Sequence, residues 1–265
     1  PLTIPLALLA GIGALSRWKR DQALRLTKAL WLPFVVSLLV GLTWPMVGMP
    51  QYSLAAGLGA SLGLWAILSA LQGLWTRTMS GRRWSGLRHT ARSIYGMTLA
   101  HIGVGVFIIG IAFTSAYTIE KDVRMTPGEA YVINGYRYRF DGVVNIEGPN
   151  YQTRTGTVTV FRGENEVARL HPEKRIYRLQ SNPMTEAGID AGLFRDLYVA
   201  LGEPLGTEGA WSVRLYYNAF VRWIWLGPLL MALGGLIAAS DRRYRRLRVR
   251  ENHLPGTEAA TSKAG

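Results

Sequence analysis

The residue with the clearest chemical potential in this sequence is His101, which stands alone among apolar and small residues in the run from Tyr95 to Tyr117. As a helix, that run is long enough to cross a hydrocarbon core of about 30 Å, and His101 lies about 9 Å from Tyr95. An ionisable side chain inside a bilayer predicts a function, and a neutral imidazole is the commonest metal ligand. Two interpretations stand: a ligand or proton relay, and a histidine that only hydrogen-bonds a neighbouring helix.

Four glycines in the same run, listed here, would let a large planar group or another helix approach closely: Gly96, Gly103, Gly105 and Gly110. The other three histidines of the chain, His89, His171 and His253, lie outside the apolar segments. Heme is the cofactor that most often takes one imidazole on each face from separate helices. A heme bound at His101 would therefore need its second ligand from elsewhere.

Three more apolar runs have the length that a bilayer demands: Leu30 to Gly48, Tyr52 to Trp75 and Phe220 to Ser240. Leu2 to Leu15 is apolar too, but reaches only about 21 Å as a helix. The sequence opens at Pro1, so we expect this segment to be the cut end of a longer polypeptide rather than a signal peptide. The prediction is a membrane helical bundle of four full spans and one truncated apolar segment.

Basic residues indicate the orientation of these spans. Segments 16–29, 76–94 and 241–265 hold 17 of the 30 Lys and Arg residues and account for the net charge of +13. Loops of this kind stay in the cytoplasm, so residues 117–219 are expected outside. The run 241–250 follows a span directly, where contact with lipid headgroups explains the charge without nucleic acid.

Residues 117–219 form the one stretch outside the spans that is long enough for a folded core. Alternating patterns over 136–145, 152–161 and 211–217 predict strands, and a short hairpin is expected across 162–165 with a return strand over 166–170. Gly142, Gly148 with Pro149, and Gly163 are expected in turns, and 185–201 in a short helix or a strand. We expect a small antiparallel sheet or an open barrel between the last two spans.

Several classes of function are excluded by what the sequence lacks. It contains no cysteine, so it cannot exchange disulfides or hold a metal through thiolates. It also contains no phosphate-binding loop, GxSxG or HExxH motif. No catalytic residue is predicted.

Three strings make the chain resemble a known family: MTLAHIGVGVFIIG at 97–110, the segment LHPEKRIYRLQ to RDLYVALGE at 170–203, and YYNAFVRWIWLGPLLMALGGLIAASDRRYR at 216–245. Together with PLTIPLALLAGIGALSRWKRD at 1–21, they resemble the C-terminal part of the CcmF family of system I cytochrome c maturation. The resemblance covers nearly the whole chain except its last dozen residues.

The resemblance implies a role in the bacterial inner membrane, with the β domain in the periplasm and the C-terminus in the cytoplasm. CcmF proteins form the core of the cytochrome c heme lyase. They receive heme from the chaperone CcmE, and with CcmH/CcmI-type subunits they promote its attachment to the CxxCH motif of apocytochrome c. They also hold a b-type heme between two histidines and are thought to use it to reduce the incoming heme.

His101 matches the second of these axial ligands. The first lies in the N-terminal part of the family's protein, with the histidines that hold the substrate heme, and is not in this sequence. The chain is therefore expected to need that part for activity.

Three basic residues are weaker candidates. Arg222 either extends to the outer headgroups beside Trp223 and Trp225 or contacts a heme propionate. Lys174 and Arg175, with Arg178, either occupy the solvated face of a strand or meet propionates or an acidic partner. Methionines of the spans are read as packing residues.

Other classes of protein stay open. A transporter or export permease would show broken helices with charges near the bilayer midplane. A tethered sensor would need an output domain larger than the 25 residues after Ser240. A related heme lyase subunit for a nitrite reductase cytochrome is a further alternative.

Overall fold

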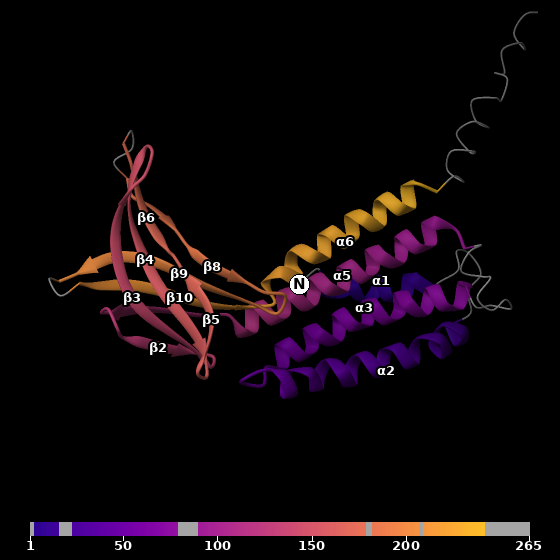
Figure 1. Cartoon of the computed structure of the whole chain (residues 1–265). Coiled ribbons are helices and arrows are strands. Elements are labelled where there is room, and N and C mark those ends of the chain that lie inside the picture. Colours follow the sequence, from indigo (N-terminus) through magenta and orange to yellow (C-terminus); the bar gives the residue numbers. More distant parts are fainter. Residues whose placement is uncertain (1–2, 16–22, 79–89, 179–181, 207–208, 242–265) are drawn as a thin grey trace, which may run out of the picture.

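The computed structural model describes residues 3–15, 23–78, 90–178, 182–206 and 209–241. An elongated bundle of apolar helices lies on one side of the molecule and an all-β domain on the other (Figure 1). The helices are α1 Thr3–Leu15, α2 Ala23–Gly48, α3 Leu54–Thr78, α5 Arg92–Tyr117 and α6 Val221–Ala239. Four of them, α2, α3, α5 and α6, are long and apolar enough to cross a membrane, and α1 is shorter. The expected bundle of four spans plus one short apolar segment is confirmed.

Three of the long helices, α2, α3 and α5, extend beyond the apolar runs that predicted them, at the end where basic residues gather. Helix α2 begins at Ala23, α3 continues to Thr78 and α5 begins at Arg92. Two arginines close the end of α1: Arg77 donates a hydrogen bond to the Ala14 carbonyl at 2.8 Å, and Arg25 donates to the Leu15 carbonyl at 3.2 Å. Guanidinium groups at this position satisfy carbonyls that the helix itself leaves unpaired.

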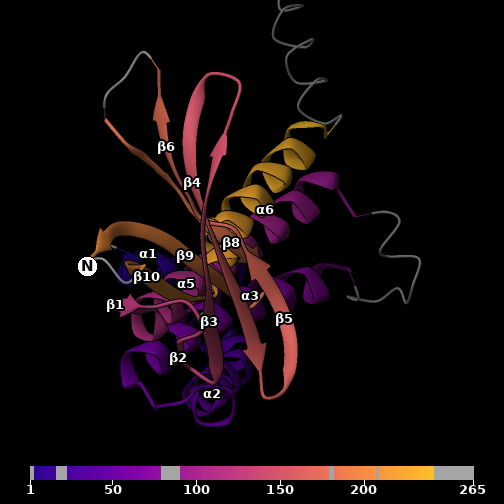
Figure 2. The same ribbon diagram turned by 60° about the vertical axis from the view of Figure 1, so that its left-hand side comes forward.

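The β domain is a sandwich of two antiparallel sheets, so the single sheet or open barrel expected from sequence is wrong in its architecture. One sheet has the order β1-β10-β9-β8 and the other β2-β3-β4-β6-β7, with β5 also paired to β4. The strands of the first sheet are β1 Ile119–Met125, β8 Gly188–Ala191, β9 Arg195–Leu205 and β10 Ala210–Ala219. Those of the second are β2 Ala130–Ile133, β3 Tyr136–Glu147, β4 Tyr151–Arg162, β5 Asn165–Leu170, β6 Glu173–Tyr177 and β7 Met184–Glu186. In Figure 2 the strands β3 and β4 of one sheet run across the strands β9 and β10 of the other.

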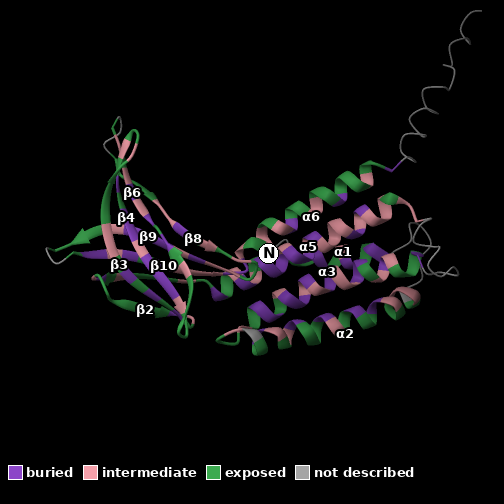
Figure 3. Ribbon diagram, in the orientation of Figure 1, coloured by how far each residue is buried: buried purple, intermediate pink, exposed green. Residues whose placement is uncertain are grey.

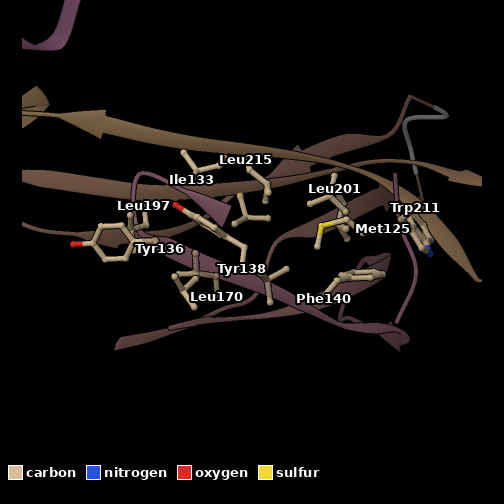
Figure 4. Packing of buried hydrophobic residues seen from close by; sticks show 14 residues of the cluster. Met125, Ile133, Tyr136, Tyr138, Phe140, Leu170, Leu197, Leu201, Trp211 and Leu215 are labelled. Carbon is tan, nitrogen blue, oxygen red and sulfur yellow. The ribbon is translucent and has the colours of Figure 1, made fainter. Parts of the chain in front are cut away.

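Alternating side chains from both sheets fill the space between them. On β3, Tyr138 and Phe140 are buried while Arg137 and Arg139 are exposed, which is the period-two pattern of a strand with one wet face. Figure 4 shows Tyr138 and Phe140 packed with Leu201 and Leu215 of the opposite sheet and with Met125 of β1. Apolar burial of this kind is the main source of the domain's stability.

One local expectation was wrong. Gly142 does not turn the chain: it lies inside β3 at a bulge between Phe140 and Gly142, with φ of 130° that favours glycine. For the segment 185–201 the sequence allowed a short helix or a strand, and the strand is confirmed, because the segment contributes to β7, β8 and β9. The hairpin across 162–165 is confirmed, because β5 pairs with β4.

The sandwich joins the bundle without a linker at either end. Tyr117 ends α5 and Ile119 begins β1, while β10 ends at Ala219 and α6 begins at Val221. The Thr114 hydroxyl of α5 donates to the Ala219 carbonyl at 2.7 Å, which ties the two connections together. The neighbouring Phe220 has φ of 53°, an unusual value for a bulky residue, and its side chain is buried.

Candidate functional site

His101 lies on α5, nine residues after Arg92. At 1.5 Å per residue this is about 13 Å along a helix of 26 residues, deeper than the sequence estimate because α5 begins three residues before Tyr95. The histidine is thus in the half of the helix nearer its basic end. The ring is half-buried, so part of it lies at the surface of the bundle.

One nitrogen of the His101 ring is engaged within its own helix. The Nδ1 atom lies 2.8 Å from the Met97 carbonyl, one turn earlier, and a carbonyl can only accept, so Nδ1 carries the proton. In that tautomer Nε2 has a free lone pair. This is the arrangement that orients metal-binding histidines, in which the second nitrogen donates to a backbone oxygen. The geometry fits one imidazole ligand to a metal such as heme iron.

The glycines of α5 serve helix packing, which is one of the two roles that the sequence allowed. A Cβ added at Gly103 would lie 2.6 Å from the Gly227 carbonyl of α6, and one at Gly110 would lie 2.8 Å from the Ile224 nitrogen. These glycines therefore let α5 and α6 touch backbone to backbone (Figure 1).

The opposite side of α5 is closed by α3. A Cβ at Gly63 of α3 would meet the Gly105 carbonyl at 2.6 Å. Gly105 is four residues after His101, which corresponds to a rotation of about 40° around the helix axis. The His101 ring therefore leaves α5 next to the side that contacts α3, and it points away from the side that α6 covers.

The end of α5 near His101 is anchored by a residue that sequence analysis missed. Asp241, which follows α6, is buried and its carboxylate accepts a hydrogen bond from the Ser93 backbone N–H at 3.1 Å. A carboxylate at a helix N-terminus satisfies an unpaired donor and interacts favourably with the helix dipole. Asp241 opens the run 241–250, which the sequence assigned as a whole to contact with lipid headgroups.

Lys174 does not occupy a solvated face, and that part of the sequence interpretation is wrong. It is buried on β6, where its ammonium group donates to the Gly202 carbonyl at 3.0 Å and pairs with Glu203, both on β9. Its charge links the two sheets. A contact with a propionate or a partner was not tested and remains a prediction.

Arg175 and Arg222 are also engaged inside the chain. The Nε atom of Arg175 donates to Glu173 at 2.7 Å, and its guanidinium lies 5.0 Å from the Tyr151 ring centroid. Arg222 donates to Asp196 at 3.1 Å while half of its side chain stays exposed. Asp196 is on β9, so Arg222 holds the start of α6 against the sandwich. The proposed propionate contacts of these residues remain predictions.

Among the described residues, the other histidine, His171, lies apart from His101. His171 is exposed on the sandwich, with Nδ1 3.5 Å from the Thr157 hydroxyl, and His89 and His253 lie outside the described residues. Within the described ranges no group of three or more His, Cys, Asp or Glu side chains is placed to hold a metal ion.

A cavity of about 690 Å³ lies where the bundle meets the sandwich, and sequence analysis did not anticipate it. Its bundle side is formed by Trp44, Met49 and Phe220, and its sandwich side includes Arg162 and Arg195. Tyr217 also lines it, and burial raises the pKa of that phenol above its ordinary value. The residues come from five separate segments, so no local pattern could have revealed the cavity.

Fold and site together define a multi-pass membrane bundle with a β-sandwich inserted before its last span and with His101 in one span, hydrogen-bonded to its own helix. Residues 116–219 match a family model described as the CcmF C-terminal beta-sandwich. The chain is homologous to the C-terminal part of CcmF proteins.

Individual relatives support this assignment. The chain is 44% identical over 254 residues to the cytochrome c-type biogenesis protein CcmF of Pseudomonas aeruginosa, covering 95% of this chain and 38% of that protein. It is 41% identical to CcmF of Escherichia coli over 245 residues, with 92% and 37% covered. The cytochrome c-type biogenesis protein NrfE of Haemophilus influenzae is 32% identical over 162 residues, with 61% and 25% covered.

A solved structure shows the same architecture. The structure titled Cytochrome c Heme Lyase CcmF matches with a TM-score of 0.73 and 25% identity, over 91% of this chain and 39% of that one. The chain thus spans about 38% of the length of the curated CcmF relatives named above.

Proposed function

We propose that this chain is the C-terminal part of a membrane heme lyase of cytochrome c maturation, with His101 as one axial ligand of a b-type heme. The homology to CcmF proteins supports the pathway, and the greater identity to CcmF than to NrfE favours this subunit over a lyase of the NrfE type. The whole protein would then attach heme to the CxxCH motif of apocytochrome c, with CcmE as heme donor and CcmH/CcmI-type subunits as presenters of the apocytochrome.

The observation that carries the ligand assignment is the hydrogen bond from His101 Nδ1 to the Met97 carbonyl. It selects the tautomer with an open Nε2 and fixes the plane of the ring. A heme bound there supplies one-electron redox chemistry, which suits reduction of an incoming heme. The second axial histidine is proposed to come from the part of the relatives that this chain does not span.

The transporter alternative finds little support in the spans. Helices α2 and α6 contain prolines, Pro33 and Pro45 in one and Pro228 in the other, yet both continue through them. None of the four described spans contains an acidic residue. The paired charges that a transporter would place near the midplane are therefore missing from them.

The experiment replaces His101 with Gly in the complete protein and records the visible spectrum and the heme content after purification in detergent. We expect loss of most of the b-type absorption, and partial recovery when imidazole is added to fill the vacated position. His171→Gly, on the exposed sandwich surface, is the matched control and should leave the spectrum unchanged. A full bis-histidine spectrum in the His101 variant would refute the assignment.

A further inference from the structure

The cavity between bundle and sandwich has the features of a binding site for an amphiphilic anion. Its floor is aromatic: Trp44, Phe220 and Phe194 surround Trp223, with ring centroids 6.3, 5.1 and 6.3 Å from that indole. Trp44 and Phe220 line the cavity from the bundle and Phe194 from the β8–β9 loop. A floor of this kind accepts apolar groups and excludes water.

The wall opposite this floor carries an excess of positive charge. The guanidinium of Arg162 lies 5.5 Å from the Tyr136 ring centroid, and that of Arg195 lies 5.2 Å from the same centroid. Arg195 pairs with Asp190, whereas Arg162 has no salt bridge to any residue that the structure describes. Two guanidinium groups on one ring, of which only that of Arg195 pairs with a described carboxylate, favour a bound anion.

The ends of the helices indicate the depth of the cavity. Met49 lies just after α2, Phe220 just before α6, and Tyr117, the last residue of α5, packs in the same cluster as Phe220. The level at which three spans end is the headgroup region of a bilayer. Tryptophan and tyrosine gather at that level in membrane proteins, as Trp44, Trp223 and Tyr117 do here.

An apolar surface continues from the cavity along α2. Met46 and Val47, close to Trp44 in sequence, are 64% and 90% exposed. Outward green faces of α2 and α6 in Figure 3 show the same exposure along the bundle. The acyl chains of a lipid would cover such a surface, while the headgroup of the same lipid contacted Arg162 and Arg195.

We propose that this cavity binds an anionic phospholipid of the leaflet next to the sandwich, with its phosphate at Arg162 and its glycerol end over Trp44 and Phe220. The lipid would hold the sandwich against the bundle at a fixed depth. Because Arg195 already pairs with Asp190, Arg162 is the residue that would make the cavity prefer an anionic lipid to a neutral one. The proposal does not depend on the heme role of His101.

The test uses the purified complete protein after extensive delipidation in detergent, and measures its thermal transition with added phosphatidylglycerol. We expect a rise of about 2–4 °C for the unmodified protein and a loss of most of that rise for Arg162→Gln. Arg162→Lys, which keeps the charge without the flat stacking group, should give an intermediate rise. Arg169→Gln, an exposed arginine of β5 paired with Glu166, is the matched control and should behave as the unmodified protein.

Three other ligands distinguish a site for an anionic lipid from a site for phosphate, for any lipid or for a porphyrin. Inorganic phosphate and phosphatidylcholine at the same concentration should give little or no rise. An equal rise with inorganic phosphate would show a site for free phosphate, and an equal rise with phosphatidylcholine would show apolar binding without charge selectivity. A rise with protoporphyrin but not with phosphatidylglycerol would assign the cavity to a porphyrin. Each of these results, or an unchanged response of Arg162→Gln, overturns the proposal.

Discussion

At the scale of single residues, hydrogen bonds between side chains and backbone groups fix the orientation of His101 and the start of its helix. His101 is oriented by the Met97 carbonyl, and the start of its helix is held by Asp241 through the Ser93 N–H. The sequence identified His101, because an imidazole in an apolar run is conspicuous. It could not identify Asp241, whose partner is 148 residues away.

Replacing Asp241 with Ala should destabilise the bundle by about 1 kcal/mol, because the Ser93 N–H and the dipole of α5 lose their anionic partner. Thermal unfolding of the purified protein in detergent measures the change. Ser240→Ala, which removes an exposed hydroxyl bonded only to the Ile237 carbonyl, is the control and should have little effect. Equal stability of the two variants would contradict the capping role.

At the scale of elements, close helix contact and cross-sheet ion pairing govern the architecture. Helices α5 and α6 meet at glycines spaced by seven residues on both: Gly96, Gly103 and Gly110 on one, and Gly227 and Gly234 on the other. The sequence shows these glycines, yet it leaves open whether they face a helix or a planar cofactor. Only the packed structure distinguishes the two, since both need a flat surface.

Gly103→Val should destabilise the bundle by roughly 1–3 kcal/mol, because the added side chain meets the Gly227 carbonyl and the Met231 nitrogen. Gly235→Ala on α6 is the control, since a Cβ there meets nothing within 4 Å. Thermal unfolding in detergent compares them, and the heme content reports whether α5 has shifted. A Gly103 variant as stable as the Gly235 variant would show that the contact is not tight.

Lys174→Ala should destabilise the sandwich by about 2 kcal/mol, because the Gly202 carbonyl and Glu203 lose a buried charged donor. Arg169→Ala, at an exposed arginine on β5, should change stability by less than about 0.5 kcal/mol. Denaturant unfolding followed by near-ultraviolet circular dichroism, which reports the packed aromatic residues, measures both. If Lys174 served only as a surface contact for a partner, its removal would leave the unfolding transition unchanged.

At the scale of the whole molecule, the direct junctions of the sandwich with α5 and α6 couple the two parts. The Thr114 hydroxyl, Phe220 and the ion pair of Arg222 with Asp196 all lie at this boundary. The basic residues of segments 16–29, 76–94 and 241–265 indicate the orientation that we propose, with the sandwich outside.

The absence of cysteine makes this orientation simple to test. A cysteine introduced at Glu164, in the turn between β4 and β5, should react with a membrane-impermeant maleimide in intact cells. One introduced at Ser262 in the tail should react only after the membrane is permeabilised. The reverse pattern would invert the proposed topology, and labelling at both positions in intact cells would rule out a single orientation.

Much of the fold could be predicted from local patterns. Four spans followed from apolar length, and β3, β4, β5 and β10 followed from alternation and turn residues. Strands β1 and β2 were missed because β2 is short and β1, from Ile119 to Met125, is rich in charge. The cavity at the junction was missed because its lining residues are scattered over five segments.

The sequence by itself determined that this chain enters a membrane, where its spans lie and that His101 lies within one of them, because those properties depend on consecutive residues. The tertiary structure decided that the β strands form two packed sheets, that Lys174 links those sheets and that the α5 glycines contact neighbouring helices, α6 at three of them and α3 at Gly105. Those outcomes depend on contacts between residues far apart in the chain, which no local pattern encodes.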